Sequence, residues 1–326
     1  MSSVSYSYAK LEMFSENKSG ATEFVIWGFS DNPSLQPILC LIFLLIYVLT
    51  VSGNVVIISL IFYDVHLQKP MYYFLCNMSF LDFSYSTVTA PYMLYVLFTG
   101  HKNLSIKRCM TQLYFFNTFA SVEYLLLTTM AFDRYMAICK PFLYMHVMNR
   151  RACFWLSVAA WISGFTAALP VTILSSTLTF CASKVINHFF CDVTPLLKLS
   201  CDDITDIEMT MFTEGIVLLF SCFLLTVMSY VYIISAILKI QSTEGRHKAF
   251  STCASHLTVV VLFYILVVCV YMKPTSSYSL DVGKIVSVLY VNVIPMLNPF
   301  IYSLRNKDVK DALVKVFKDH FHKNML

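Results

Sequence analysis

The stretch Ile38–Phe62, ILCLIFLLIYVLTVSGNVVIISLIF, runs for 25 residues without a charged side chain. A helix needs roughly 20 mostly apolar residues to cross a membrane, because the hydrocarbon layer is about 30 Å thick. A helix also satisfies its own backbone hydrogen bonds in lipid, where water is absent. The stretch therefore predicts a membrane-spanning helix.

Six further stretches have a similar length and apolar character. They are Met71–Phe98, Cys109–Phe132, Ala152–Phe180, Met209–Leu238, Ala249–Met272 and Ile285–Leu304. None of them shows the alternation of apolar and polar residues that the strands of a membrane barrel need. We therefore predict an all-α membrane protein in which residues 1–326 form a single domain built on a bundle of seven transmembrane helices.

The composition excludes most other classes of protein. The chain is 58% hydrophobic and 13% charged, whereas soluble domains carry about 25% charged residues. The eight glycines are scattered, and the sequence contains no GxGxxG, phosphate-binding loop, CxxC, HExxH or GxSxG motif. We expect neither an enzyme nor a cofactor, and no nucleic-acid partner.

The loop charges predict an orientation in the membrane. If residues 1–35 form an extracellular tail, the inner segments carry 14 of the 23 Lys and Arg residues and six acidic residues, a net charge of +8. The outer segments then carry a net charge of −1. Positive loops stay on the cytoplasmic side, so the N-terminus is expected outside and residues 306–326 inside. Residues 1–20 are polar, and no cleavable signal peptide is expected.

Two glycosylation sequons fall on the predicted outer side, at Asn17 and Asn103. At the other end, Asn306–Phe321 carries apolar residues at helical spacing between lysines. Such a helix is expected to lie along the inner membrane surface, with its lysines near acidic lipid headgroups. A frayed tail is the alternative.

Polar residues inside the spans are costly and suggest function. The acidic ones are Asp82, Glu123 and Glu214, and the amides include Asn54 and Asn298. The two amides have an equally simple interpretation as hydrogen bonds between helices. That interpretation does not exclude a role in switching.

The string Met130–Cys139, MAFDRYMAIC, sets Asp133 beside Arg134 at the inner end of the third span. Arginine is always charged and carries a planar fork of donors. It can pair with its neighbouring acid in one state and with another partner in a second state. Taken alone, such an acid–arginine pair more often only anchors the end of a helix at the membrane–water interface.

This string resembles the MAYDRYVAIC signature of mammalian-type olfactory receptors, which belong to the rhodopsin-like class of G-protein-coupled receptors. Phe132 and Met136 depart from it mildly. Similar matches occur through residues 22–320, and the longest are KPMYYFL at Lys69–Leu75, KAFSTCASHL at Lys248–Leu257 and PMLNPFIYSLRN at Pro295–Asn306.

The resemblance implies an odorant receptor of the sensory-neuron plasma membrane that activates a stimulatory, olfactory-type heterotrimeric G protein and raises cyclic AMP. A rhodopsin-like receptor for a non-odorant small molecule is one alternative. A transporter is a weaker one, because neither paired broken helices nor an internal repeat is evident.

The resemblance also implies two sets of functional residues. The ligand pocket is expected in the outer half of the bundle, lined by Phe116, Asn117, Ala120, Ser121, Met211, Glu214, Tyr264, Val268, Tyr271, Val288 and Val291. The G-protein switch is expected at the inner end, formed by Asp133, Arg134, Tyr135, Tyr230, His256, Asn298, Pro299 and Tyr302. Ordinary helix packing is as good an explanation for each single lining residue.

Four cysteines lie in the predicted outer segments, and four cysteines allow three pairings. The resemblance implies Cys109–Cys191, which leaves Cys181–Cys201. It also places Asp82 and Glu123, with Asn54, in a polar core at the centre of the bundle. Two neighbouring buried carboxylates cannot both stay charged without a cation, so they either share a proton or hold a sodium ion. Otherwise one of them caps a polar network.

Overall fold

The computed structural model describes residues 23–29, 32, 34–181, 184–271, 280–305 and 307–323. Asn17 lies outside this part of the chain. Within the described helices, the side chains of some residues are not placed, among them those of Lys248, Val268, Tyr271 and Tyr302.

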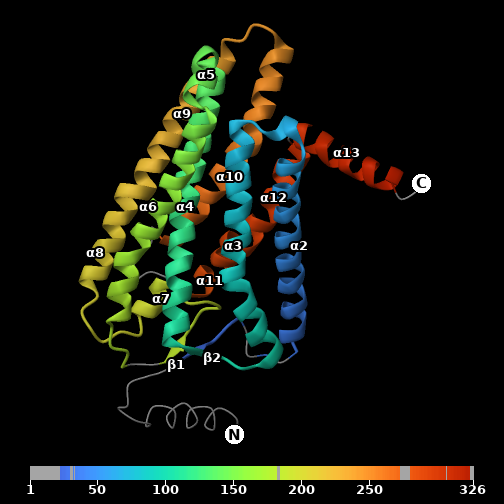
Figure 1. The fold of residues 1–326 in the computed structure, drawn as a ribbon. Helices are drawn as coiled ribbons and strands as arrows, with labels where there is room; N and C mark the ends of the chain where they lie inside the picture. The colour runs from blue at the N-terminus through green and yellow to red at the C-terminus, as the bar shows by residue number, and fades with distance from the viewer. Residues whose placement is uncertain are drawn as a thin grey trace.

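The described residues form a bundle of long helices that run up and down side by side (Figure 1). Seven elements make up the bundle: α2 (Gln36–Tyr63), α3 (Pro70–Thr99), α4 (Ile106–Cys139), α6 (Arg150–Ser176), α8 to α9 (Thr205–Leu238), α10 (Thr243–Tyr271) and α11 to α12 (Leu280–Arg305). Two of them contain a π-helical turn, η2 (Gly215–Phe220) and η4 (Leu289–Val293). The predicted all-α bundle of seven helices is confirmed.

Several helices have the length and composition needed to cross a membrane. Among the described residues, four segments are long and apolar enough: Gln36–Tyr63, Arg150–Ser176, Thr205–Leu238 and Gly283–Ile301. Helices α3, α4 and α10 contain 30, 34 and 29 residues and are also long enough. Many large apolar side chains remain exposed on the bundle, among them Leu41 and Phe62, as lipid-facing residues are.

Local sequence signals set the helix ends. Pro70 opens α3, where its missing N–H costs nothing. Ser105 and Asn149 cap α4 and α6, since their side chains accept hydrogen bonds from the Arg108 and Ala152 amides. Gly100 ends α3 in the left-handed conformation, with φ 73°.

A three-stranded sheet lies across one end of the bundle, which we call the sheet end (Figure 1). Its central strand β1 (Glu23–Ile26) pairs antiparallel with β2 (Asn103–Ser105) and parallel with β3 (Val185–Ile186). Phe24 and Ile26 are buried in one apolar cluster with the cysteines of the adjacent disulfide. The segment before the first helix thus covers the loops that follow α3 and α6.

Two disulfides fix the long loop between α6 and α8. Cys109 is bonded to Cys191 with a Cα separation of 5.3 Å, and Cys181 to Cys201 with 5.9 Å. Both values lie inside the usual limit of about 7 Å. The short helix α7 (Val193–Leu197) follows Cys191.

The fourth predicted span is too long at one end. It was expected to reach Phe180, but α6 ends at Ser176. Phe180 instead forms a bridge with Ser200, and the Thr179 amide donates a hydrogen bond to Asp202. The chain leaves the helix because these contacts tie it to the segment beside Cys201.

The opposite end of the bundle carries α5 (Pro141–Val147), the 3-10 turn η1 (Val65–Leu67) and α13 (Lys307–Lys323), and we call it the α13 end (Figure 1). Asp308 of α13 accepts hydrogen bonds of 3.0 Å from both Lys69 Nζ and Tyr72 Oη. Val309 and Ala312 are buried against the bundle. Part of the apolar face of α13 therefore packs on protein.

Helices α2 and α12 approach closely where Gly53 faces Pro299. A Cβ atom added at Gly53 would lie 3.1 Å from the Pro299 ring, so a larger residue would push the helices apart. Beside this contact, Asn54 Nδ2 donates to the Pro295 carbonyl at 3.2 Å. Asn54 thus joins two helices, as expected from its interpretation as an interhelical hydrogen bond.

Candidate functional site

The predicted G-protein switch lies at the α13 end, where α4 carries Asp133 and Arg134. Both side chains are buried, at 1% and 8% exposure. Asp133 Oδ1 accepts a 2.9 Å hydrogen bond from Tyr144 Oη of α5. The acid therefore pairs with a tyrosine that sequence reasoning did not single out.

Arg134 occupies a different environment from its neighbour. Its Nη2 atom is buried and finds no hydrogen-bond partner among the described residues. The side chain interacts electrostatically with Tyr230 and His256. Those two residues join α9 to α10, since Tyr230 Oη lies 2.6 Å from His256 Nδ1. The structure thus brings together Arg134, Tyr230 and His256 from three helices.

The remaining predicted switch residues are spread along the same end. Tyr135 is half-buried, and its ring lies 5.8 Å from that of Tyr232. Pro299 is buried inside α12, one residue beyond Asn298. Tyr302 lies in α12, but its side chain is not among those described.

The polar core lies deeper in the bundle. Asn298 Nδ2 donates to Asp82 Oδ2 at 2.9 Å, which links α12 to α3. Glu123 of α4 is 5% exposed and close enough to Asp82 to interact with it electrostatically. Asn298 Oδ1 and Asn292 Nδ2 are buried and have no partner in the described part of the chain.

These donors fit a small hard cation better than a transition metal. Carboxylate and amide oxygens are the ligands that hard cations prefer. No group of three or more His, Cys, Asp and Glu residues that could hold a metal ion occurs among the described residues. The unpaired oxygen of Asn298 beside Asp82 is the atom that a cation or a water molecule would satisfy.

The predicted pocket residues divide into two groups. Phe116 belongs to the first, because its ring contacts Tyr85, Phe190 and Tyr290 at centroid distances of 5.2, 4.6 and 6.5 Å. It therefore faces α3, η4 and the loop after α6. Val291 of η4 is fully buried, and Val288 packs against the same core.

The second group lies toward α8, η2 and α9. Ser121 Oγ is 3.1 Å from Tyr124 Oη, and Tyr124 interacts electrostatically with Glu214. The Glu214 Oε1 atom is buried without a partner among the described residues. Tyr264 packs edge-on against Phe223 at 5.1 Å. Three further predicted pocket residues are half-buried: Asn117, Ala120 and Met211.

Sequence reasoning missed the loop residues that reach the pocket region. His188, Phe189 and Phe190 are at most 1% exposed, although they belong to an irregular loop. The pattern of two phenylalanines directly before a disulfide cysteine was the available signal, because disulfides hold such loops against the bundle. Tyr85 and Tyr290 were also missed, since an aromatic residue in a span gives no indication of which way it faces.

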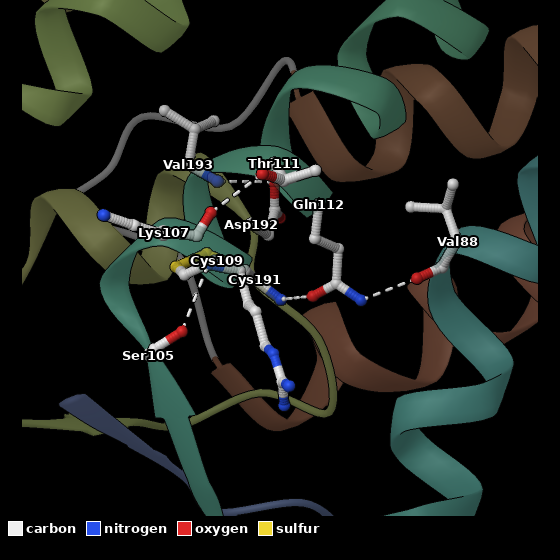
Figure 2. Close-up of a disulfide and its surroundings, with 10 residues drawn as sticks. Val88, Ser105, Lys107, Cys109, Thr111, Gln112, Cys191, Asp192 and Val193 are labelled. Carbon is white, nitrogen blue, oxygen red and sulfur yellow. Dashed lines mark hydrogen bonds between the residues drawn. A yellow bond between two sulfur atoms is a disulfide. The ribbon is translucent and has the colours of Figure 1, made fainter.

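The hydrogen bonds around the first disulfide fix this loop (Figure 2). Gln112 Oε1 accepts from the Cys191 amide at 2.8 Å, and its Nε2 donates to the Val88 carbonyl at 2.9 Å. One side chain of α4 therefore holds the loop and α3 together. Asp192 Oδ1 accepts from the Val193 amide at 2.8 Å and so caps α7.

Comparison with solved structures shows which fold this is. Squid rhodopsin superposes with a TM-score of 0.68, covering 87% of this chain and 81% of that protein, at 15% sequence identity. At this identity the likeness shows the fold alone, that of the rhodopsin-like receptors.

Comparison of sequences is more specific. A family model described as olfactory receptor matches residues 43–320. Olfactory receptor 5AR1 of Mus musculus is 48% identical over 304 residues, which cover 93% of this chain and 98% of the relative. Olfactory receptor 8G1 of Homo sapiens is 47% identical over 306 residues, which cover 94% and 98%. These relatives are membrane receptors and not enzymes. The chain belongs to the olfactory receptor family of rhodopsin-like G-protein-coupled receptors.

Proposed function

We propose that the chain, as a single receptor domain, is an odorant receptor. It binds a small volatile organic molecule in the half of the bundle nearest the sheet end. It then activates a stimulatory, olfactory-type heterotrimeric G protein at the α13 end and raises cyclic AMP. The names of its relatives and the geometry of both ends support this function.

The single observation that carries the proposal is the Nη2 atom of Arg134, which has no hydrogen-bond partner among the described residues. A buried charged donor without a partner is unfavourable, so the side chain is suited to gain a partner in a second state. Outward movement of α10 would separate His256 from Tyr230 and open a cleft beside Arg134. Such a two-state element responds to any ligand that binds one state more tightly.

The other switch residues support this movement. Tyr135 follows Arg134 on α4 and packs against Tyr232 of α9, and Tyr302 of α12, whose side chain lies outside the described residues, would approach Arg134 in the active state. Pro299 removes a backbone hydrogen bond within α12 and provides a point of bending. Asn298 connects this helix to Asp82, and the ligand signal can pass through that hydrogen bond.

The ligand pocket consists of apolar residues with a few polar groups, the usual character of a small-molecule site. Phe116, Val288 and Val291 supply one apolar wall, and Met211 and Ala120 supply another. Polar orientation comes from Asn117, Ser121, Glu214 and Tyr264. The predicted lining also includes Val268 and Tyr271, whose side chains lie outside the described residues. A weakly polar, volatile molecule suits this lining.

We place the protein in the plasma membrane, with the sheet end outside and the α13 end inside. Both disulfides lie at the sheet end, in agreement with an oxidising exterior. Asn103 is exposed on β2 and is the glycosylation site that this orientation makes accessible, with Asn17 as a second one. Lys310 and Lys318 of α13 are exposed and would contact acidic lipid headgroups.

Inside the bundle, Asp82 and Glu123 either share a proton or hold a sodium ion with Asn298. Asn54 and the Asp82–Asn298 bond connect three helices around this position. The polar core would then stabilise one of the two receptor states.

A cyclic-AMP reporter assay tests the function. Cells that express the chain and the olfactory-type stimulatory G protein are exposed to an odorant panel, with surface expression checked by antibody. At least one compound should raise cyclic AMP in a dose-dependent way. A response only to non-odorant small molecules would favour another rhodopsin-like receptor. Substrate uptake by proteoliposomes without any cyclic-AMP response would favour a transporter.

A further inference from the structure

The loop segment His188–Phe190 is fixed at the sheet end from both sides. The His188 amide donates to the Ile186 carbonyl at 2.8 Å, and the His188 carbonyl accepts from the Gly28 amide at 3.1 Å. On the other side, Phe190 is followed by Cys191, which forms the disulfide with Cys109 and whose amide donates a hydrogen bond to Gln112 Oε1 (Figure 2). The backbone at His188 is therefore held in place before any ligand arrives.

The imidazole of His188 is buried among aromatic rings. It stacks on Phe189 at 4.7 Å and meets Phe190 edge-on at 4.6 Å. It is 0% exposed, and neither ring nitrogen has a hydrogen-bond partner in the part of the chain described. Buried polar atoms normally have a partner, and the described residues supply none for the donor and the acceptor at this position.

The charge that acts on His188 is positive. Lys284 of α11 is 7% exposed, and its ammonium group interacts electrostatically with the imidazole. Burial and this ammonium group lower the pKa of His188 to about 3. The ring is therefore neutral near pH 7 and offers one N–H donor. Asp192, four residues further along the chain, is also buried. One of its carboxylate oxygens accepts a hydrogen bond from the Val193 amide.

Aromatic contacts connect His188 to residues of the proposed odorant pocket. Phe190, which contacts the imidazole, packs at 4.6 Å against Phe116. Phe116 in turn contacts Tyr85 and Tyr290. A chain of aromatic contacts thus leads from the loop to the apolar wall of the pocket, with His188 as its polar end.

We propose that His188 is the polar contact at the sheet end of the odorant site, and that its N–H donates a hydrogen bond to a carbonyl or carboxylate oxygen of the ligand. This inference rests on the proposed function. The positive charge of Lys284 favours an oxygen that carries negative charge over a donor group. The ligand class is therefore an aldehyde, ketone, ester or carboxylate whose apolar body packs on Phe190 and Phe116.

Ligand binding to the purified full-length receptor in lipid nanodiscs tests this assignment. The probes are two matched series, octane, octanal and octanoate, and toluene, benzaldehyde and benzoate. Affinity is measured from the thermal stabilisation that each probe produces. His188→Phe keeps a ring of similar packing and removes both nitrogens, whereas His188→Asn keeps a donor. His101→Phe is the matched control, because His101 is exposed at the same end.

The wild-type receptor should bind the oxygen-bearing probes more tightly than the hydrocarbons. His188→Phe should weaken the oxygen-bearing probes about five- to tenfold, the value of one hydrogen bond, and leave the hydrocarbons unchanged. His188→Asn should recover most of the loss, and His101→Phe should change nothing. Equal effects on both kinds of probe, an unchanged affinity in His188→Phe, or binding of none of the probes would overturn the proposal.

The two proposals can fail separately, because nanodisc binding does not require a G protein. Binding that depends on His188 without any cyclic-AMP response in cells supports the contact and contradicts the proposed function. A cyclic-AMP response to oxygen-bearing odorants that is unchanged in His188→Phe contradicts the contact and leaves the function standing.

Discussion

Tyr230 and His256 face each other between α9 and α10, with the phenolic oxygen 2.6 Å from Nδ1 of the imidazole. Both side chains are buried, and their rings are stacked at 5.9 Å. This contact holds together the two helices whose separation would open a cleft at the α13 end. Its strength therefore bears directly on the switch.

A double-mutant cycle measures this contact. Tyr230→Phe leaves His256 Nδ1 buried without its partner, which should cost about 1–3 kcal/mol of stability. Tyr230→Phe, His256→Phe and the double variant should be non-additive in thermal unfolding of the purified receptor, with a coupling of roughly 0.5–3 kcal/mol. Strict additivity of the two changes would show that the residues do not interact.

Gln112 should be essential for the position of the loop after α6. Gln112→Leu removes the acceptor for the Cys191 amide and the donor for the Val88 carbonyl. The loss should be about 1–3 kcal/mol, because a buried amide is left unpaired. Gln112→Glu keeps the acceptor and should lose less. Thermal unfolding measures the stabilities of the wild type, Gln112→Glu and Gln112→Leu, which should decrease in that order. A Gln112→Leu receptor as stable as the wild type would contradict this prediction.

The two disulfides should differ in importance. Cys181→Ser with Cys201→Ser opens a loop with a sequence separation of 20 residues, which should cost about 3 kcal/mol and leave a folded receptor. Cys109→Ser with Cys191→Ser also disrupts a fully buried cluster, so surface expression should be nearly lost. Flow cytometry of an N-terminal tag checks this, and equal expression of the two variants would refute the ranking.

The buried imidazole of His188 predicts a pH dependence. Its pKa is about 3 in the folded receptor because of burial and Lys284, whereas the unfolded value is near 6.5. Between these values the unfolded chain binds a proton that the folded chain excludes, so stability falls as the pH drops below about 6.5. His188→Phe should flatten the decline in melting temperature between pH 7.5 and 5. Parallel curves for the two receptors would contradict this.

Asp192 should act in the opposite direction. Burial raises the pKa of its carboxyl group to about 6, although the Val193 amide opposes the shift. The folded state then holds a proton that the unfolded state has lost, so this residue contributes stability at low pH that disappears as the pH rises through 6. Asp192→Asn removes this contribution and leaves that of His188. The melting temperature of the Asp192→Asn receptor should therefore fall more steeply than that of the wild type on acidification.

The spans could be predicted from the sequence because apolar length alone determines them. Ile38–Phe62 and Met71–Phe98 differ from α2 and α3 by only one or two residues at each end. The π-helical turns within Thr205–Leu238 and Leu280–Arg305 could not be predicted, since they depend on packing and leave no change in the apolar pattern.

The sheet was also beyond sequence reasoning. Its strands contain two to four residues, too few to show the alternation that predicts a strand. Val25 pairs with Val185, and only the folded bundle brings these distant residues together. The bond between Asp133 and Tyr144 was missed for a similar reason, because α5 folds back onto the end of α4. Arg134, which the sequence had offered as a partner of the acid, also interacts with Asp133 electrostatically.

The most direct test of the account is the ability of Arg134 to couple ligand binding to a G protein. Nucleotide exchange on a purified stimulatory G protein is measured with the wild-type and Arg134→Ala receptors in nanodiscs, using an odorant identified by the cyclic-AMP assay. We predict that the odorant accelerates exchange with the wild type, and that Arg134→Ala binds the same odorant and reaches the cell surface but does not accelerate exchange. Full acceleration by Arg134→Ala would contradict the account.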